Sequence, residues 1–424
     1  MILSILIPTL NEEINIRKLV PCLREVMIGV LPESEYEIVI ADARSEDNIE
    51  QVVKDNNAKL VVVSRGYGIA IANGIKACRG KYIITMDADF SHSPYIVPIL
   101  FAARHQAEVL IASRYIKNGF SQSGFFRQFL SWILNTFYRV ALNLPIRDLS
   151  SGFRLYHKRI FDEVAPTEVN YVVLQEILIK AYSRGFRVKE VPFHYHPRKH
   201  GFSKSRILAF GKDYLRALFK FWRLRNSHEC ADYDERAFNS RFYFQRIWQK
   251  RRYSIICDYA REYRAILDIG CGSSQILDGL PQAVGMDLQM NMLRYKRAPH
   301  KVLIRGDIRH IPFANGVFEA TIASQVIEHL PRNPVILDEV LRVTKPGGFI
   351  IIGTPDYSTR WRIIEWFYQL LHPSGYADKH PSHWTRRELF REMEKRGCSL
   401  CGYEYIFGAE LIAKFQKKTE PLPQ

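Results

Sequence analysis

Two carboxylates one residue apart, Asp87 and Asp89, are the side chains in the first half of the chain best suited to chemistry. They follow Tyr82–Met86, a run whose composition predicts a buried strand. Alternation along an extended backbone puts both carboxylates on the same side. Two hard oxygen ligands at the carboxyl end of a strand suit Mg²⁺ or Mn²⁺, with substrate phosphates completing the coordination. A solvated Asp-x-Asp turn is the alternative, and the surrounding motifs must decide between them.

A second set of residues suited to chemistry lies in the other half of the chain. The segment Ala265–Ile269 predicts an apolar strand, and Gly270 and Gly272 follow it in a turn where a ligand can approach the backbone closely. Asp287 ends the next predicted strand, and Asp307 comes twenty residues later. An acid at the end of the second strand is the usual partner of ribose hydroxyls, so this pattern predicts a nucleoside-containing ligand.

The elements that position the acid pair alternate between strand and helix. Strands are expected at 3–7, 36–41, 59–63 and 82–86, and helices at 12–26, 45–56 and 68–78. This rhythm predicts a mostly parallel sheet with helices on both faces. The polar loops that follow the strands, at 8–13, 42–47, 65–68 and 87–92, would then meet in one continuous site. We expect the whole chain to be α/β, with two doubly wound domains.

Composition and length restrict the class of protein. The 424 residues exceed one ordinary domain, and 47% hydrophobic with 25% charged residues is typical of a globular protein. The net charge of +16 indicates a polyanionic partner. Seven scattered cysteines form no disulfide framework, and Cys398 and Cys401 make a single CxxC, so reduced cytosolic thiols fit best.

The hydropathy of the sequence predicts neither a signal peptide nor a membrane-spanning segment. The apolar start Met1–Ile7 lacks a basic region before it and a cleavage site after it, so we expect a buried strand and no signal peptide. No window approaches 18 uninterrupted apolar residues, so no transmembrane helix is expected. The expected location is the cytoplasm, with peripheral contact to the cytoplasmic face of a membrane.

Six motifs follow one another within residues 1–225: LSILIPTLNEEINI, IVIADARSEDN, GYGIAIANGIKACRGKYIITMDADFSHSP, ASRY, IRDLSSGFR and RKHGFSK. In this order they resemble the GT-A glycosyltransferases of the polyprenyl-phosphate (dolichol-phosphate) mannosyltransferase type. The resemblance implies a GT-A (nucleotide-diphospho-sugar transferase) fold. It also implies inverting transfer of a hexose, mannose or glucose, from a GDP- or UDP-linked sugar to a polyprenyl phosphate with Mg²⁺ or Mn²⁺. A polyprenyl phosphate is already an anionic nucleophile, so this chemistry needs no dedicated general base.

The resemblance assigns roles to residues of this chain. The nucleotide-sugar site would be formed by Pro8, Leu10, Glu12, Asp42, Gly68, Asp87, Ala88 and Asp89. The metal would be held by Asp87, Asp89 and Ser91, the last standing where the family has a glutamine. The catalytic set would be Asp87, Asp89, Arg114, Arg127, Ser151, Arg154, Arg198 and Lys204.

The helix expected at 125–143 carries Arg127, Ser131 and Asn135 on one face, because they are spaced four residues apart. In the family such a helix borders the lipid-phosphate site; an ordinary polar stripe is the alternative. Further on, nine Lys or Arg stand against one acid between Arg198 and Arg225. This predicts an amphipathic helix on an anionic membrane surface, and a solvated basic helix remains the alternative.

The ordered set Asp268, Asp287, Asp307, EHL at 328–330 and KPGG at 345–348 resembles the class I S-adenosylmethionine (SAM)-dependent methyltransferases, which have a Rossmann-like fold. A glycine-rich turn alone would also fit a dehydrogenase. The ordered set of motifs argues against that alternative. The resemblance assigns SAM binding to Asp268, Gly270, Gly272, Asp287, Asp307, Ile308 and Gln325. If the methyl acceptor is a hydroxyl, His329, His380 and His383 are candidate bases, with structural roles as the alternative.

These observations predict a glycosyltransferase domain at 1–206, a basic amphipathic helix and linker at 207–231, and a methyltransferase domain at 232–424. The expected function is a bifunctional enzyme of cell-envelope glycan biosynthesis that glycosylates a polyprenyl phosphate and methylates a related glycan. In the alternative, the sugar goes to a lipid-linked or soluble glycan hydroxyl, and the second domain is a SAM-binding or interaction module. Nucleic acid is disfavoured as a partner because no RNA-binding motif accompanies the charge.

Overall fold

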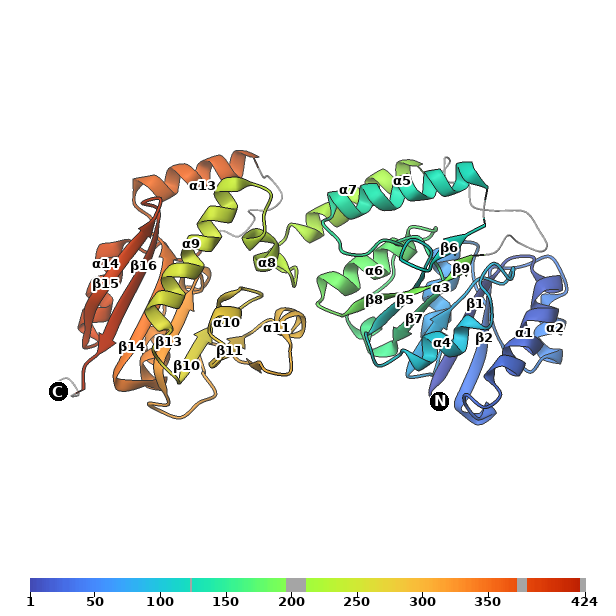
Figure 1. Ribbon diagram of the computed structural model, residues 1–424, viewed down its shortest axis with the longest axis horizontal. Coiled ribbons are helices and arrows are strands. Elements are labelled where there is room, and N and C mark those ends of the chain that lie inside the picture. The colour runs from blue at the N-terminus through green and yellow to red at the C-terminus, as the bar shows by residue number, and fades with distance from the viewer. Residues whose placement is uncertain (123, 196–210, 372–379, 420–424) are drawn as a thin grey trace. The chain divides into compact units, whose positions relative to one another are not determined.

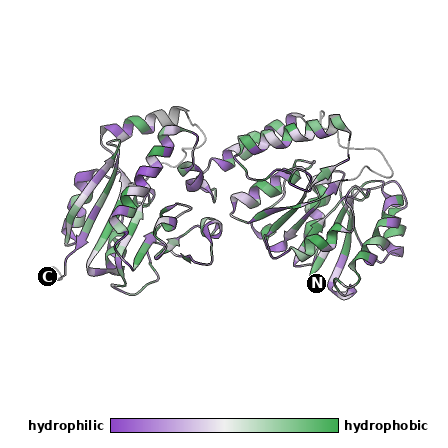
Figure 2. Cartoon of the chain, viewed as in Figure 1, coloured by the Kyte–Doolittle hydropathy of each residue, from purple (hydrophilic) through white to green (hydrophobic). Residues whose placement is uncertain are grey.

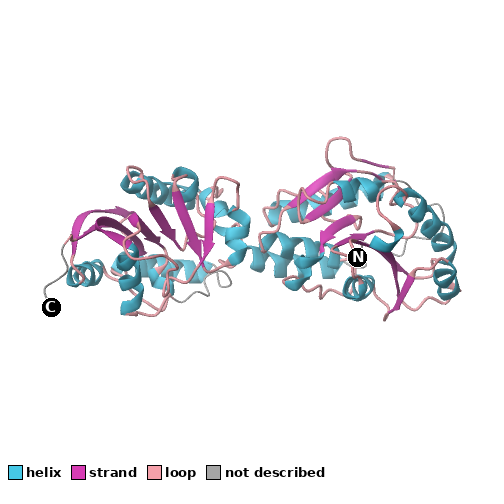
Figure 3. Cartoon of the chain, turned by 90° about the horizontal axis from the view of Figure 1, so that it is seen from below, coloured by secondary structure: helices cyan, strands magenta, loops and turns pink. Residues whose placement is uncertain are grey.

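The computed structural model describes residues 1–122, 124–195, 211–371 and 380–419. The chain divides into two compact units, Met1–Arg225 and Asn226–Gln424. Each unit contains a seven-stranded sheet flanked by helices (Figures 1 and 3), so the predicted pair of doubly wound α/β domains is confirmed.

The sheet of the first unit has the order β3-β2-β1-β4-β7-β5-β8. Its strands are β1 (Leu3–Thr9), β2 (Tyr36–Asp42), β3 (Lys59–Val62), β4 (Tyr82–Thr85), β5 (Val109–Ser113), β7 (Arg154–His157) and β8 (Val188–Pro192). Strand β7 is antiparallel to β4 and β5, whereas the other neighbouring pairs are parallel. A separate two-stranded sheet pairs β6 (Phe120–Ser121) with β9 (His194–Tyr195).

The helices of this unit cover both faces of the sheet (Figure 3). They are α1 (Glu13–Met27), α2 (Ile49–Asp55), α3 (Tyr67–Ala77), α4 (Ile96–Ala102), α5 (Phe125–Ala141), α6 (Val173–Ser183) and α7 (Gly211–Arg225), with short 3₁₀ turns η1 (Glu33–Glu35) and η2 (Lys158–Asp162). One hydrophobic core joins the sheet to α1, α2 and α4, and a second joins it to α3, α5, α6 and α7. Strands with two covered faces are predominantly apolar, which explains the hydrophobic runs along β1 and β4. Figure 2 shows the hydrophobic residues concentrated in the strands of the sheet.

The order of strands places the polar loops together. Strand β1 pairs in parallel with both β2 and β4, so that Ile5 lies opposite Ile38 on one side and Ile84 on the other. The chain reverses its direction of travel across the sheet at β1, and ligands of such sheets bind at the carboxyl ends of the strands at this point. The loop after β1 and the acid pair after β4 therefore meet at one edge.

The second unit has the strand order β12-β11-β10-β13-β14-β16-β15, again with the reversal beside its first strand, β10. Its strands are β10 (Ile266–Ile269), β11 (Ala283–Asp287), β12 (Val302–Arg305), β13 (Phe318–Ser324), β14 (Thr344–Pro355), β15 (Cys398–Ile406) and β16 (Glu410–Lys417). Strand β16 is antiparallel to β14 and β15, and the other pairs are parallel.

The helices of the second unit are α8 (Tyr233–Phe238), α9 (Tyr243–Ala260), α10 (Ile276–Gly279), α11 (Met290–Lys296), α12 (Pro334–Val343), α13 (Thr359–Leu371) and α14 (Arg386–Lys395), with a 3₁₀ turn η3 (Ile327–His329). Helices α8 and α9 precede the first strand of the sheet and are separated by a short break after Phe238. Residues of α12 and α14 form the core on one face of the sheet, and residues of α9 and α10 form the core on the other. Within the described parts of the chain, no helix has the length and apolarity that crossing a bilayer requires.

Candidate active sites

A cavity of about 420 Å³ lies at the carboxyl edge of the first sheet, within the size range of small-ligand sites. Among the residues expected from the sequence, it is lined by Pro8, Leu10, Glu12, Asp87, Ala88, Asp89, Arg114 and Ser151. The loops after β1 and β4 thus meet in one cavity with an arginine from the end of β5.

Asp87 is held by two aromatic side chains. The hydroxyl of Tyr67 donates to Asp87 Oδ1 at 3.3 Å, and the backbone N–H of Asp87 donates to His92 Nδ1 at 2.9 Å. His92 stacks on Phe153 with ring centroids 4.9 Å apart, and its Nε2 lies 3.8 Å from Asp87 Oδ2. Burial lowers the pKa of His92, although the charge of Asp87 opposes this. A neutral ring that accepts at Nδ1 carries its proton on Nε2, which therefore faces the Asp87 carboxylate.

Asp89 is fixed by its own loop. The backbone N–H and the hydroxyl of Ser91 donate to Asp89 Oδ1 at 3.0 and 2.6 Å, and both residues are buried. Ser91 lies outside the cavity lining, so in this arrangement its hydroxyl orients Asp89. No group of three His, Cys, Asp or Glu side chains among the described residues is arranged to hold a metal. The two carboxylates suit Mg²⁺ or Mn²⁺ whose remaining ligands come from a diphosphate.

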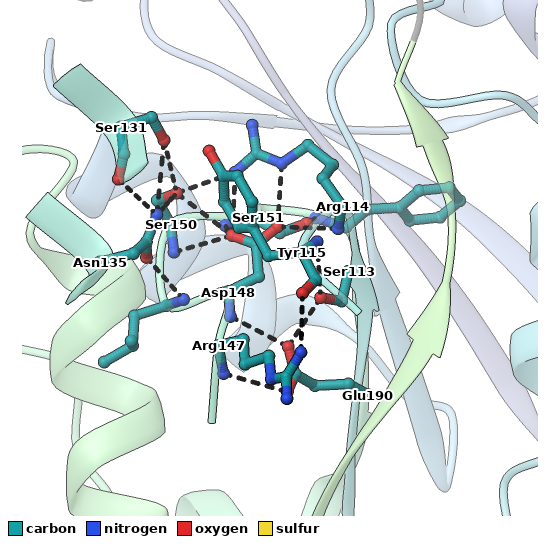
Figure 4. Close-up of polar contacts among 12 residues, drawn as sticks. Ser113, Arg114, Tyr115, Ser131, Asn135, Arg147, Asp148, Ser150, Ser151 and Glu190 are labelled. Carbon is teal, nitrogen blue, oxygen red and sulfur yellow. Dashed lines mark hydrogen bonds and ion pairs between the residues drawn. The ribbon is translucent and has the colours of Figure 1, made fainter. Parts of the chain in front are cut away.

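Arg114 and Asp148 form an ion pair beside the cavity, in which Asp148 is buried and Arg114 is partly exposed (Figure 4). Arg114 Nε and Nη2 donate to the two carboxylate oxygens of Asp148, both at 2.8 Å, and Nη2 also donates to Ser150 Oγ at 2.8 Å. Burial alone would raise the pKa of Asp148, but the charge and hydrogen bonds of Arg114 outweigh it and lower the pKa. The backbone N–H of Ser151 donates to the same carboxylate at 3.0 Å. Arg114 is therefore a fixed positive charge at the cavity wall.

The polar face of α5 joins this network (Figure 4). Asn135 Nδ2 donates to Ser150 Oγ at 3.0 Å, and Asn135 Oδ1 accepts from the backbone N–H of Leu149 at 2.8 Å. Ser131 lines the cavity, with its hydroxyl 3.4 Å from that of Ser150. Asn135 thus anchors the loop that carries Ser150 and Ser151. The side chain of Arg127, the third residue of the expected stripe, lies outside the described residues.

Several expected site residues lie outside the cavity lining. Asp42 is buried and accepts from Thr9 Oγ1 at 3.0 Å and from the backbone of Ser45 at 2.8 Å, which closes the loop after β2. Arg154 is fully buried and donates to the carbonyls of Leu149 and Leu174 at 2.7 and 2.5 Å. The first of these hydrogen bonds holds the loop that carries Ser150 and Ser151.

The loop that follows η2 packs tightly against the start of α3. Gly68 donates its N–H to the carbonyl of Val169 at 3.0 Å, and a β-carbon on Gly68 would lie 2.0 Å from the carbonyl oxygen of Glu168. Glu176 is buried and accepts from Thr167, Glu168 and Lys180, so it holds the same loop. Arg198 and Lys204 lie outside the described residues.

A larger cavity, of about 760 Å³, lies at the carboxyl edge of the second sheet. All seven residues expected to bind SAM line it: Asp268, Gly270, Gly272, Asp287, Asp307, Ile308 and Gln325. Gly270 and Gly272 have φ angles of 66° and 52°. A β-carbon on Gly270 would lie 2.4 Å from Val326 Cγ2, so glycine is required there on both conformational and steric grounds.

Acidic residues surround the glycine-rich turn. Asp287 Oδ2 accepts from the backbone N–H of Gly272 at 2.8 Å, and Asp234 Oδ2 on α8 accepts from that of Ser273 at 2.9 Å. Asp268 is buried, its Oδ2 has no hydrogen-bond partner, and burial together with Asp287 and Asp234 raises the pKa of Asp268 to about 8. A buried carboxyl with an unsatisfied oxygen suits a positively charged group. The residues therefore fit SAM, which carries an ammonium and a sulfonium.

A polar cluster around the buried Glu410 lies at the wall of this cavity, and of its members the sequence motifs include only Gln325. Glu410 on β16 accepts from Arg252 Nε and Nη2 at 2.6 and 2.7 Å and from Gln325 Nε2 at 3.2 Å, and the indole N–H of Trp248 also donates to it. Arg252, Trp248 and Gln325 all line the cavity. The cluster joins three elements that are far apart in sequence: helix α9, strand β16, and the loop that follows β13. Asp307 forms an ion pair with the nearby Arg309.

The three candidate histidines of the second unit lie near one another but differ in their positions. His329 and His380 line the cavity, with ring centroids 4.8 Å apart. His383 stacks on Tyr357, with ring centroids 4.1 Å apart, and lies outside the cavity lining.

Comparison with known proteins finds one family match in each of the two units of the chain. Residues 4–165 match the model of glycosyl transferase family 2, and residues 267–352 match that of a methyltransferase domain. A dolichol-phosphate mannosyltransferase of Pyrococcus furiosus is 31% identical over 234 residues, which cover 52% of this chain and 63% of that protein. An undecaprenyl-phosphate 4-deoxy-4-formamido-L-arabinose transferase of Pseudomonas fluorescens is 29% identical, covering 47% of this chain and 59% of that protein. The chain thus spans about three fifths of the length of these two relatives.

A dolichol-phosphate mannosyltransferase of Saccharomyces cerevisiae is 27% identical, covering 54% of this chain and 95% of that protein. Among solved structures, glucosyl-3-phosphoglycerate synthase of Mycobacterium tuberculosis aligns with a TM-score of 0.43 and 18% identity over 52% of this chain and 78% of that one. The motif sets expected from the sequence are confirmed by the two family matches. The chain therefore contains one region that matches glycosyl transferase family 2 and a second region that matches a methyltransferase domain.

Proposed function

We propose that the first domain is an inverting glycosyltransferase that moves a hexose from a nucleotide-diphosphate sugar to a polyprenyl phosphate. The observation that carries this proposal is the composition of its cavity, where the acid pair Asp87 and Asp89 and the fixed cation Arg114 line one space. Carboxylates and a cation in the same cavity suit a metal-bound diphosphate and a second phosphate. The polyprenyl-phosphate relatives support the same class of acceptor.

Each of these residues has a part in the proposed reaction. Asp87 and Asp89 would hold Mg²⁺ or Mn²⁺, which supplies stabilisation of the charge that develops on the leaving diphosphate. Arg114, already oriented by Asp148, would attract the acceptor phosphate and needs no reorganisation to do so. The acceptor phosphate is itself the nucleophile, and a single in-line displacement inverts the configuration at the sugar. The donor is proposed to be a GDP- or UDP-linked mannose or glucose.

The outer face of α5 supports an acceptor that is delivered from a membrane. Phe125 is 85% exposed, and its ring stacks on Phe129, which stacks in turn on Trp132. The opposite face of the same helix carries Ser131 into the cavity. An exposed aromatic row on an amphipathic helix is typical of segments that lie in the membrane interface.

Helix α7 lies beside α5 (Figure 1) and extends this surface. The hydroxyl of Tyr138 on α5 donates to the carbonyl of Tyr214 on α7 at 2.5 Å. On α7, exposed Leu215 and Phe219 lie among four exposed basic residues: Lys212, Arg216, Lys220 and Arg223. Apolar side chains among cations suit an anionic membrane surface, which supports our proposal that the enzyme is a peripheral protein at the cytoplasmic face of the membrane.

The second domain is proposed to be an active SAM-dependent methyltransferase that acts on a related glycan. Its support is the cavity lined by the seven expected SAM-binding residues, with the unsatisfied oxygen of Asp268 inside it. The two activities on one chain would serve one pathway of cell-envelope glycan synthesis.

A donor screen tests the glycosyltransferase proposal. The full chain is incubated with vesicles containing polyprenyl phosphate, with GDP-mannose, GDP-glucose or UDP-glucose, and with Mg²⁺ or Mn²⁺. We expect hexose in the lipid fraction, at least a hundredfold less of it with Asp89→Ala, and no change with Asp162→Ala, an exposed acid elsewhere in the same domain. Full transfer by Asp89→Ala would refute the role of the acid pair.

A further inference from the structure

The methyltransferase cavity extends beyond the residues that would hold SAM. A second group of lining residues is formed by aromatic and histidine side chains: Phe244, Trp248, His329, Trp361 and His380. The rings of Trp248 and Trp361 have centroids 6.0 Å apart. This group comes from α9, η3, α13 and the segment before α14, and it contains no residue of the expected SAM-binding set. It therefore has the position and composition of an acceptor site.

His380 in this group is held by two further side chains. Its Nδ1 is hydrogen-bonded to the hydroxyl of Tyr357, and that hydroxyl donates to Glu365 Oε1 at 3.2 Å. Glu365 Oε1 also lies 3.9 Å from His380 Nδ1. Tyr357 and His380 are both buried, and burial, followed by the charge of Glu365, raises the pKa of Tyr357, so its hydroxyl remains protonated.

The direction of these hydrogen bonds determines which nitrogen of His380 holds the proton. The phenol has one proton, and a carboxylate can only accept, so the phenol O–H points to Glu365. The phenol oxygen must then accept from His380 Nδ1–H. In a neutral imidazole protonated at Nδ1, the base is Nε2. A carboxylate that orients a histidine in this way, here through a tyrosine, is the arrangement expected of a general base.

We propose that His380 is the proton acceptor in methyl transfer to a hydroxyl group, and that Tyr357 and Glu365 are its positioning residues. This inference rests on the proposed methyltransferase activity and specifies its acceptor. In the step, the hydroxyl oxygen forms a bond to the methyl carbon while the carbon–sulfur bond of the sulfonium donor breaks. The sulfur keeps the electron pair, and the hydroxyl proton moves to His380 Nε2.

The need for a base identifies the chemical class of the acceptor. A carboxylate or a thiolate is already a nucleophile near neutral pH, whereas an alcohol must lose its proton as the new bond forms. The two tryptophans that line this part of the cavity offer flat apolar surfaces, which suit a ring with apolar faces and hydroxyl edges. The acceptor class is therefore an alcohol on a ring, such as a sugar hydroxyl.

The first test reads the tautomer of His380 without any ligand. The full chain is labelled with ¹⁵N-histidine, and long-range ¹H–¹⁵N correlation spectra assign His380 by the signal that His380→Gln removes. We expect the neutral ring to carry its proton on Nδ1, and we expect Tyr357→Phe to move it to Nε2. A wild-type ring protonated on Nε2 would overturn the proposal.

The second test measures SAM binding by calorimetry and the transfer of radioactive methyl groups from SAM. The hydroxyl probes are methyl mannoside, methyl glucoside and the hexosyl lipid made by the first domain, and an amine and a carboxylate serve as comparison probes. We expect a hydroxyl probe to be methylated. His380→Gln should lower kcat about 10²–10⁴-fold, the usual contribution of a general base, while the Kd for SAM changes less than threefold. His300→Gln, an exposed histidine of the same unit, is the matched control and should leave both unchanged.

The outcomes separate the inference from the function on which it rests. A wild-type chain that does not bind SAM contradicts the methyltransferase proposal itself, and the inference falls with it. A chain that binds SAM but methylates no hydroxyl probe, or only the amine or carboxylate, overturns the inference alone. Full activity of His380→Gln toward a hydroxyl overturns it as well. Tyr357→Phe should lower kcat about tenfold with unchanged SAM affinity, which a role in folding alone would not produce.

Discussion

Binding of SAM should release a proton from Asp268. In the ligand-free protein this carboxyl is buried near Asp287 and Asp234, and its pKa is raised to about 8. About 90% of it is therefore protonated at pH 7. A bound cation favours the ionised form and lowers the pKa toward its ordinary value of 3.8, so the proton leaves when the ligand binds. We expect about 0.9 proton released per SAM at pH 7, about 0.5 at pH 8, and almost none above pH 9.5.

Calorimetry in buffers of different ionisation enthalpy measures this number directly, because the observed binding enthalpy changes with the buffer in proportion to the protons released. Asp268→Asn should abolish the release and weaken SAM binding about 10–100-fold, or about 1.4–2.7 kcal/mol, because the amide carries no charge. Asp338→Asn, which alters an acid on the surface of the same unit, should change neither quantity. A wild-type protein that releases no proton at pH 7 would show that Asp268 is already ionised without ligand, which would contradict its raised pKa.

The same group makes the stability of the ligand-free protein depend on pH. A carboxyl whose pKa is higher in the folded than in the unfolded protein contributes stability that is present below about pH 4 and is lost as the pH rises to about 8. The loss approaches about 1.4 kcal/mol per pH unit within this window. Asp268→Asn should therefore have a higher urea midpoint than the wild type at pH 8, with a smaller difference at pH 4. Equal midpoints at both pH values would contradict this account.

Three further predictions concern the first domain. Asp148→Asn should lower the free energy of unfolding by about 3–5 kcal/mol, because it leaves the largely enclosed guanidinium of Arg114 without its charge partner; an unchanged denaturant midpoint would contradict this. Gly68→Ala should cost about 1–3 kcal/mol in the same measurement, since the new methyl group meets the backbone of the loop at 167–169, and a stabilised variant would show that this loop yields. Trp132→Asp should reduce sedimentation with anionic vesicles at least tenfold. Because the side chain is exposed, the melting temperature should stay within about 2 °C of the wild type. Undiminished sedimentation would exclude α5 from the membrane-binding surface.

The positions of the sites could be predicted from the sequence because they follow from local pattern and strand order. A β-branched strand that ends in Asp87 predicts where that carboxylate lies once the sheet is known to be parallel. The same holds for Gly270 and Asp287 in the second unit. Both acids line the cavities at the expected sheet edges. The antiparallel insertion of β7 between β4 and β5 was not predicted, since no local pattern distinguishes its direction.

The partners of the site residues could not be predicted in the same way. Tyr67 and Asp87 are 20 residues apart, and Arg252 and Glu410 are 158 apart, so no helical or strand periodicity relates them. His92, which accepts from the backbone N–H of Asp87, is a partner that the sequence did signal. It stands beside Ser91, the residue at which the motif departs from the family. Arg154 shows the opposite case. It lies within a recognised motif, yet it is fully buried and bonded to backbone carbonyls, and only the structure distinguishes such a support from a residue that faces the cavity.

The most direct test of the central claim is the structure of the product formed by the full chain. With a nucleotide-diphosphate hexose, Mn²⁺ and polyprenyl phosphate in vesicles, we expect a hexose joined through its anomeric carbon to the lipid phosphate. Nuclear magnetic resonance should show that its anomeric configuration is opposite to that of the donor. A hexose joined to a glycan hydroxyl, with none on the lipid phosphate, would contradict the proposed transfer to a polyprenyl phosphate, and a retained configuration would contradict the single displacement.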